Sequence, residues 1–152
     1  MTRKDIKARL LNLMIKNLET HIGQIRDGIL AMKESRNNDT KSSAGDKYET
    51  GREMMQIEID KFEMQLYKSQ RLKKELCDIP LEKTYHLAGS GSLVFTNAGT
   101  YLISVGIGKV ELEKEAYFAI SLASPIGLML KNKKVGDQIQ FNGKQITIEE
   151  IV

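Results

Sequence analysis

The side chains most often used in catalysis are few in this chain of 152 residues, and they are too widely spaced to form a site by themselves. Cys77 is the single cysteine, so the chain can form no internal disulfide and no cluster of thiolate metal ligands. His21 and His86 lack the partners that a catalytic triad or a zinc site requires. We therefore expect no catalytic triad and no metal cage around these residues.

Three acidic residues remain of interest, because they lie in or beside the polar segment of residues 36–45. Asp39, Asp46 and Glu49 each have a purely structural interpretation. Residues 43–46 have the form of a capping box that ends in Asp46, Asp39 suits an Asx turn, and Glu49 would complement the dipole of a helix that starts here. A functional role for these carboxylates depends on the elements that carry them.

Two helical patterns flank the polar segment. Apolar residues recur in steps of four and three from about residue 5 to 35, as in a coiled-coil seam. A similar spacing recurs from about residue 43 to 76. The Asn, Asp and Ser side chains between them compete for backbone hydrogen bonds and interrupt helices. We expect residues 1–77 to form an antiparallel coiled-coil hairpin of about 45 Å with its tip at residues 36–45.

The pattern changes at Pro80, where proline ends the second helix and β-branched, aromatic and glycine residues follow. Ser124 and Pro125 predict the start of a short helix, and Asn142 with Gly143 predicts the two-residue turn of a last hairpin. We expect residues 78–152 to form a small antiparallel β domain, so that the fold class is α+β. The predicted strands are residues 92–96, 100–105, 109–112, 116–122, 138–141 and 144–151.

Composition restricts the class of partner. Hydrophobic content of 41% and charged content of 28% are values of a globular protein, and a net charge of +3 is too small to indicate direct nucleic-acid binding. The apolar runs are far shorter than the roughly 20 residues that cross a bilayer. We expect a cytoplasmic protein with no membrane partner. Because the folded-back hairpin buries most of its own seam, we also expect the protein to be mainly monomeric.

Three short motifs and the order of the two parts carry a resemblance to a known family. The sequence Tyr-Glu-Thr-Gly-Arg-Glu occupies residues 48–53, Ser-Pro-Ile-Gly residues 124–127, and Lys-Val-Gly-Asp residues 134–137. With a helical hairpin before a small β domain, they resemble the Gre transcript-cleavage factors of bacterial RNA polymerase. The lysines of residues 131–134 either meet an acidic polymerase surface or solvate a loop.

The resemblance implies a C-terminal domain of FKBP-like fold that docks beside the secondary channel of RNA polymerase, while the hairpin enters the channel. It implies that Ser124, Pro125 and Ile126 face the polymerase. In the family, tip acids help to hold the second catalytic Mg²⁺ and orient the water that hydrolyses backtracked RNA. Asp39 would be the first acid here, and Asp46 or Glu49 the second.

The same resemblance implies no cofactor of the chain's own. The Mg²⁺ would be shared with the polymerase, Asp39 and Asp46 would contact it only within that complex, and the 3′ end of the nascent RNA would be met indirectly. Hard divalent cations prefer carboxylate oxygens, and a two-metal site turns bound water into a nucleophile. A lone tip carboxylate would bind Mg²⁺ weakly without the polymerase, so the resemblance implies that the chain is not an enzyme by itself and stimulates the hydrolytic activity of the polymerase.

The tip departs from the family pattern, because Ser42 and Ser43 stand where the family has Glu and Asn. The connection between Asp39 and Tyr48 is also about two residues longer than in the family. One interpretation is a factor that stimulates RNA cleavage; another is a regulator that occludes the channel without cleavage. A third is a coiled-coil adaptor or prolyl isomerase unrelated to transcription, although the chain has no tryptophan to line a prolyl pocket.

Overall fold

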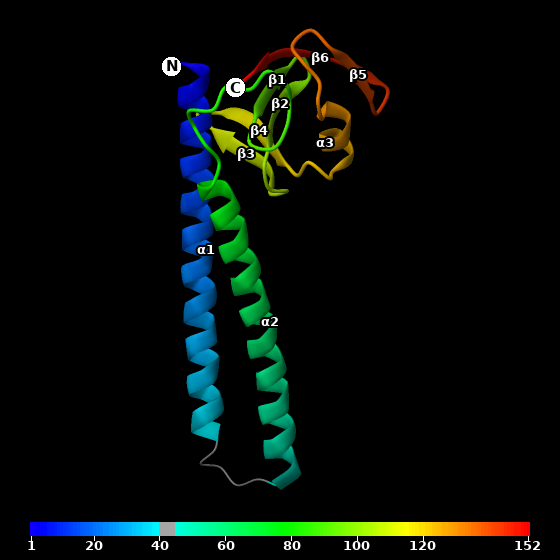
Figure 1. Cartoon of the computed structure of the whole chain (residues 1–152). Coiled ribbons are helices and arrows are strands. Elements are labelled where there is room, and N and C mark those ends of the chain that lie inside the picture. Colours follow the sequence, from blue (N-terminus) through cyan, green and yellow to red (C-terminus); the bar gives the residue numbers. More distant parts are fainter. Residues whose placement is uncertain (40–44) are drawn as a thin grey trace. The chain divides into compact units, whose positions relative to one another are not determined.

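The computed structural model describes residues 1–39 and 45–152, with side chains described for residues 1–38 and 49–152. These residues form three helices and a six-stranded mixed sheet, which confirms the α+β class (Figure 1). The chain divides into two compact units. One unit comprises residues 1–15 and 75–152, and the other comprises residues 16–74. We call them the sheet unit and the helical unit.

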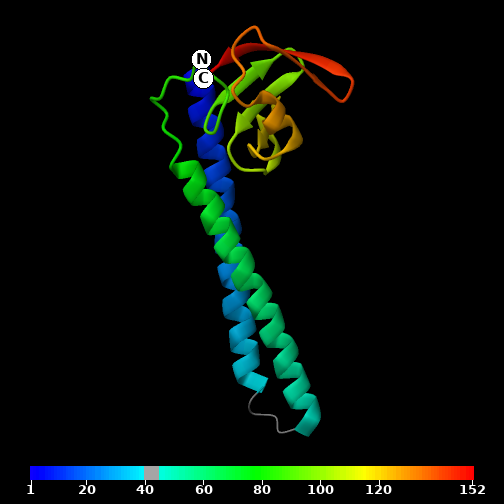
Figure 2. The same cartoon turned by 45° about the vertical axis from the view of Figure 1, so that its right-hand side comes forward.

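The helical unit contains most of α1 (Arg3–Asp39) and α2 (Gly45–Cys77), which run side by side in both views (Figures 1 and 2). Lys73 Nζ lies 3.2 Å from Glu19 Oε1, and Lys33 Nζ lies 3.3 Å from Glu63 Oε1. The later residue on α1 pairs with the earlier residue on α2, so the two helices are antiparallel, as the expected hairpin requires.

The helices pack through the apolar seam that the sequence predicts. Ile25, Ile29 and Ile59 form its buried cluster, against which further apolar side chains lie partly buried. α1 continues to Asp39, so residues 36–39 are helical although the tip was expected to begin at residue 36. The remaining expected tip positions 40–44, which include Ser42 and Ser43, lie outside the described residues.

The first turns of α1 belong to the sheet unit, whereas the sequence led us to expect a helical domain of residues 1–77 and a β domain of residues 78–152. α1 begins with a reciprocal cap, in which Thr2 N donates to Asp5 Oδ2 and Asp5 N donates to Thr2 Oγ1. Arg3 Nε then bonds Glu150 Oε2 at 2.8 Å. Leu10, in the same part of α1, is almost fully buried.

The sheet has the strand order β3-β4-β2-β1-β6-β5. β1 lies at its centre, antiparallel to both β2 and β6, and β3 and β5 are the edge strands. All six strands lie within a few residues of the predicted ranges. Their bounds are β1 (Leu93–Thr96), β2 (Gly99–Ile103), β3 (Gly108–Leu112), β4 (Glu115–Ile120), β5 (Gln138–Phe141) and β6 (Lys144–Ile151).

The expectation of a purely antiparallel sheet is wrong at one pairing. β2 and β4 are parallel, with Leu102 opposite Ala119. The cause lies in β3, which forms the edge of the sheet and returns to β4 through a tight turn at Glu113 and Lys114, both with positive φ. β4 therefore runs back beside β2 in the same direction, which makes the sheet mixed.

The core of the sheet unit lies between the sheet and α3 (Pro125–Leu130). Ile126 and Leu130 of α3 are buried with Val94 and Ile103 of the sheet. The predicted hairpin turn of residues 142–143 is confirmed, because both residues have positive φ as a two-residue turn of this type requires.

Candidate functional site

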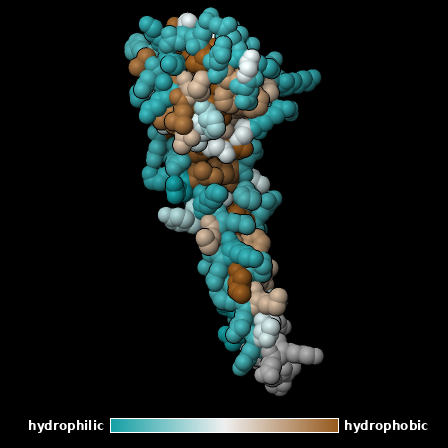
Figure 3. All heavy atoms as spheres, turned by 90° about the vertical axis from the view of Figure 1, so that its right-hand side faces the viewer, coloured by the Kyte–Doolittle hydropathy of each residue, from teal (hydrophilic) through white to brown (hydrophobic). Residues whose placement is uncertain are grey.

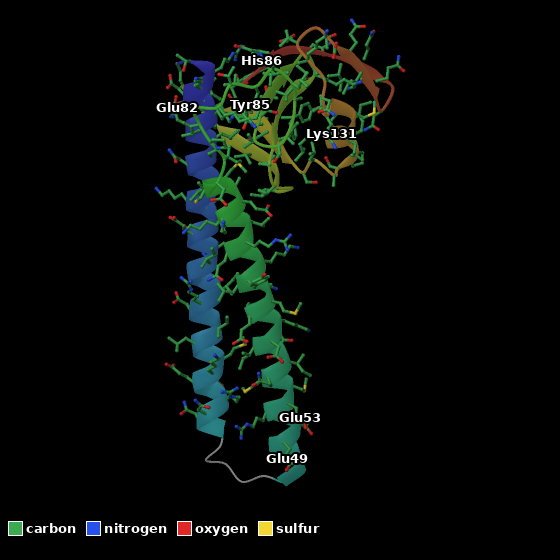
Figure 4. All side chains as sticks on the ribbon, viewed as in Figure 1. Glu49, Glu53, Glu82, Tyr85, His86 and Lys131 are labelled. Atoms are coloured by element: carbon green, nitrogen blue, oxygen red, sulfur yellow. The ribbon has the colours of Figure 1, made fainter. Side chains whose placement is uncertain are left out.

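The acidic residues expected at the tip belong to the ends of α1 and α2 that residues 40–44 join. Asp39 is the last residue of α1, and Asp46 lies in the first turn of α2. Their side chains lie outside the described residues. Glu49 is exposed, and Glu53 lies one turn further along α2 (Figure 4).

The neighbouring turns of the helical unit are linked by polar side chains. Arg36 Nη1 donates to Gln56 Oε1, and Gln56 Nε2 donates to Asp60 Oδ1 at 2.9 Å. Arg36 Nε is buried without a hydrogen-bond partner among the described atoms. The bond from Arg36 to Gln56 joins α1 to α2 close to the ends that carry the acids, and Asp60 holds Gln56 from within α2.

α2 also has an apolar stripe that α1 does not cover. Met54, Ile57, Met64 and Tyr67 are all exposed, and their spacing of three and seven residues places them along one side of the helix. Figure 3 shows hydrophobic side chains at the molecular surface among hydrophilic ones. A helix with two apolar faces has one face available for another surface.

The turn before α3 is built by side-chain capping, as the sequence predicts. Ser124 Oγ accepts from Gly127 N at 3.1 Å and donates to Ser121 O at 2.7 Å, and Pro125 is the first residue of the helix. Pro125 is exposed, whereas Ile126 is only 8% exposed and belongs to the core. Ile126, one of the three residues expected to face a partner, is therefore a core residue behind the turn and is not at the surface.

Two exposed apolar residues of α3 were not anticipated. Leu128 is 61% exposed and Met129 is also exposed, and Lys131, which directly follows the helix, is exposed as well (Figure 4). The signal in the sequence is the composition of α3. Apart from Pro125 and Gly127, every residue of this helix has a large apolar side chain. One buried face of so short a helix cannot cover them all.

A second unanticipated feature surrounds Tyr85 in the sheet unit. The Lys7 ammonium lies 4.3 Å and the Lys83 ammonium 4.9 Å from the centroid of the Tyr85 ring. Lys7 Nζ also donates to the main-chain oxygen of Val152 at 3.2 Å. Burial, with the nearby charges of Lys4 and Lys83, lowers the pKa of Lys7 to about 8.

The described side chains contain no group of three or more His, Cys, Asp or Glu that could hold a metal ion. His21 and His86 are both exposed. Within the described parts of the chain, no helix combines the length and apolar character needed to cross a membrane.

Comparisons with protein-family models, curated proteins and solved structures found no match to this chain.

Proposed function

We propose that the chain is an accessory factor of bacterial RNA polymerase of the Gre type. The helical unit enters the secondary channel, and Asp39, together with Asp46 or Glu49, assists the polymerase's Mg²⁺ in hydrolysing backtracked RNA. The observation that carries the proposal is the pair of antiparallel helices whose joined ends bear these three acids. The sheet unit, of FKBP-like type, anchors the factor.

The chemistry of the tip follows from the residue types. Carboxylate oxygens are suitable ligands for Mg²⁺, which holds several waters and is often bound through one or two carboxylates. A carboxylate beside the second metal helps to fix that ion and to orient the attacking water. The metal belongs mainly to the polymerase, so the isolated chain has little hydrolytic activity of its own.

The surface beside α3 supports docking of the sheet unit. Pro125 and Leu128 are exposed beside the capped turn, and Lys131 and Lys134 add positive charge. An apolar centre with a charged rim is typical of a protein interface. The partner surface on the polymerase would be acidic around an apolar contact. The exposed stripe of α2 would contact the channel wall.

A second candidate function is a channel regulator that binds in the same way but does not promote cleavage. Ser42 and Ser43 favour it, because a serine stands where the family has its second acid. Such a factor would slow transcription by occluding the channel. It differs from the first candidate only in the role of the tip carboxylates.

A cleavage assay on backtracked transcription complexes, preceded by co-purification with the polymerase, tests the proposal. We expect Asp39→Ala to lower the rate of RNA shortening by about 100-fold or more, since an assisting group contributes about 10²–10⁴-fold. Asp46→Ala and Glu49→Ala identify the second acid, because only one should have a comparable effect. Glu53→Ala, one turn beyond Glu49, is the matched control and should retain activity.

The outcomes separate the candidates. If the wild type binds polymerase but shortens RNA no better than Asp39→Ala, the cleavage function is lost and the occluding regulator remains. If the wild type does not co-purify with polymerase, both are lost.

A further inference from the structure

The exposed apolar stripe of α2 contains a groove of the kind through which coiled coils pair. The groove has a volume of about 400 Å³ and is lined by Asp60, Glu63, Met64 and Tyr67. Their spacing along the helix makes these four residues neighbours on its surface. In a coiled coil, four residues arranged in this way form the hole that receives a side chain, the knob, of a facing helix. Met64 is 74% and Tyr67 69% exposed, so this hole is open.

The same stripe carries a suitable knob. Ile57 is exposed and lies one heptad before Met64, on the same side of α2. It cannot fill the hole of its own helix, because both face outward. A second copy of α2 that runs in the opposite direction would place its Ile57 in the hole. The first copy's Ile57 would then fill the equivalent hole of the second copy, as the two-fold symmetry of a dimer requires.

The charges along the stripe favour this antiparallel direction. The first half of the stripe carries the acids Glu53 and Asp60, and the second half carries the bases Lys61 and Lys68. In an antiparallel pair centred between Asp60 and Lys61, residues at equal distances from the centre face each other. The facing pairs are Met54 with Tyr67, Ile57 with Met64, Glu53 with Lys68, and Asp60 with Lys61. A parallel pair would bring like charges together instead.

Two further acids, Glu58 and Glu63, would also lie opposite each other at the flanks of this pair. Each already has a cation within its own copy. Lys61 Nζ lies 3.3 Å from Glu58 Oε1, and Lys33 Nζ lies 3.3 Å from Glu63 Oε1. These ion pairs offset the two negative charges.

We propose that two copies of this chain form a symmetric dimer through antiparallel pairing of their α2 stripes. The interface is one face of one helix, and specific interfaces below about 1,200 Å² belong to weak complexes. We therefore expect a dissociation constant of about 10–100 µM, so that the chain is mainly monomeric at lower concentrations. The inference does not depend on the polymerase or on the tip acids. The dimer covers the stripe proposed to contact the channel wall, so dimerisation and channel entry exclude each other.

Sedimentation velocity of the full-length protein at low salt, from about 5 to 500 µM, tests the dimer, because this range spans the expected dissociation constant. We expect a reversible shift from monomer to dimer. Ile57→Ala should weaken association at least about tenfold, since both holes lose their knob. Leu30→Ala is the matched control: Leu30 is an exposed apolar residue of α1 in the same unit but outside the stripe, and its loss should change nothing.

Charge reversal tests the direction of pairing. Glu53→Lys alone and Lys68→Glu alone should each weaken association at least about threefold, because both facing pairs then carry like charges. An equal mixture of these two variants should associate about as tightly as the wild type, since each facing pair of the mixed dimer is again opposite in charge. Both residues are exposed, so neither change disturbs the core.

The proposal is overturned if the wild type stays monomeric throughout this range of concentration. It is overturned equally if a dimer forms and Ile57→Ala weakens it no more than Leu30→Ala does, because another surface would then pair the copies. If the mixture of charge variants associates no better than either variant alone, the antiparallel arrangement is wrong.

Discussion

Lys7 has a side chain that is 1% exposed, and burial lowers its pKa to about 8. The unfolded chain keeps the ordinary lysine pKa near 10.5. Between these values the unfolded state binds the proton and the folded state does not, so the free energy of unfolding rises with pH. The stabilisation is complete above pH 10.5 and is lost as the pH falls to about 8. Its full size is about 3 kcal/mol.

We predict that Lys7→Met removes this dependence. From pH 7.5 to 9.5, the free energy of unfolding of the wild type should rise by about 2 kcal/mol relative to that of Lys7→Met. Urea denaturation of both proteins at the two pH values measures it, and groups other than Lys7 cancel in the difference. A pH-independent difference would show that the amine stays charged in the folded protein.

Gly127 has no room for a side chain. A Cβ at this position would collide with the main-chain oxygen of Ser121 and lie 2.9 Å from that of Leu122. We predict that Gly127→Ala destabilises the protein by about 1–3 kcal/mol, because the cap of α3 must shift. Gly28→Ala is the control: its Cβ meets nothing within 4 Å, and alanine in a helix is favoured by about 1 kcal/mol. In chemical denaturation, the midpoint of unfolding should fall for Gly127→Ala and rise for Gly28→Ala.

The environment of some of these residues can be predicted from the sequence, and that of others cannot. The cap at Ser124 was predictable because serine before proline at a helix start is a local signal. The environment of Lys7 was not, since it arises from Tyr85 and Val152, which are far from it in the sequence. The metal-assisting role expected for Asp39 and Asp46 remains a prediction, because their side chains lie outside the described residues.

At the scale of elements, α1 and α2 depend on a narrow seam. Ile59 is 0% exposed in this seam, whereas Ile57, two residues earlier on the same helix, is 55% exposed. We predict that Ile59→Ala lowers the free energy of unfolding by about 2–4 kcal/mol through lost burial and a cavity, while Ile57→Ala changes it by less than about 1 kcal/mol. Thermal denaturation followed by circular dichroism compares them. Equal effects would mean that Ile57 is also covered.

Elements with a local signal were predicted well, and one pairing between strands was not. The ranges of β5 and β6 match the structure because the turn at Asn142 and Gly143 determines the hairpin. The parallel pairing of β2 with β4 depends on β3 taking the edge of the sheet, which no residue spacing within β2 or β4 indicates.

At the scale of the whole molecule, the chain divides within α1 and α2 rather than at the boundary of an element. The sequence shows one continuous helical pattern through residues 5–35, yet residues 1–15 belong to the sheet unit. Met14, for example, is buried, although the predicted seam runs through Leu11, Ile15 and Leu18 and does not include it. A periodic pattern predicts that a face is buried, but it does not identify the surface that covers it.

The two units should also differ in local stability. In the sheet unit, β1 has hydrogen-bonded neighbours on both sides, and Leu93 and Val94 are completely buried. The buried apolar side chains of the helical unit lie along the seam between its two helices and include Ile25, Ile29 and Ile59. Amide protection reflects the free energy of local opening, which is higher where more backbone and apolar surface must be exposed.

We therefore predict that amides of β1 exchange with solvent at least about tenfold more slowly than those of α2 between residues 49 and 74, a difference of about 1.4 kcal/mol. Native-state hydrogen exchange followed by NMR measures both in one sample. Ile59→Ala serves as the control, since it should accelerate exchange in α2 and leave β1 unchanged if the units open independently. Equal acceleration in both would show that the molecule unfolds as one cooperative unit.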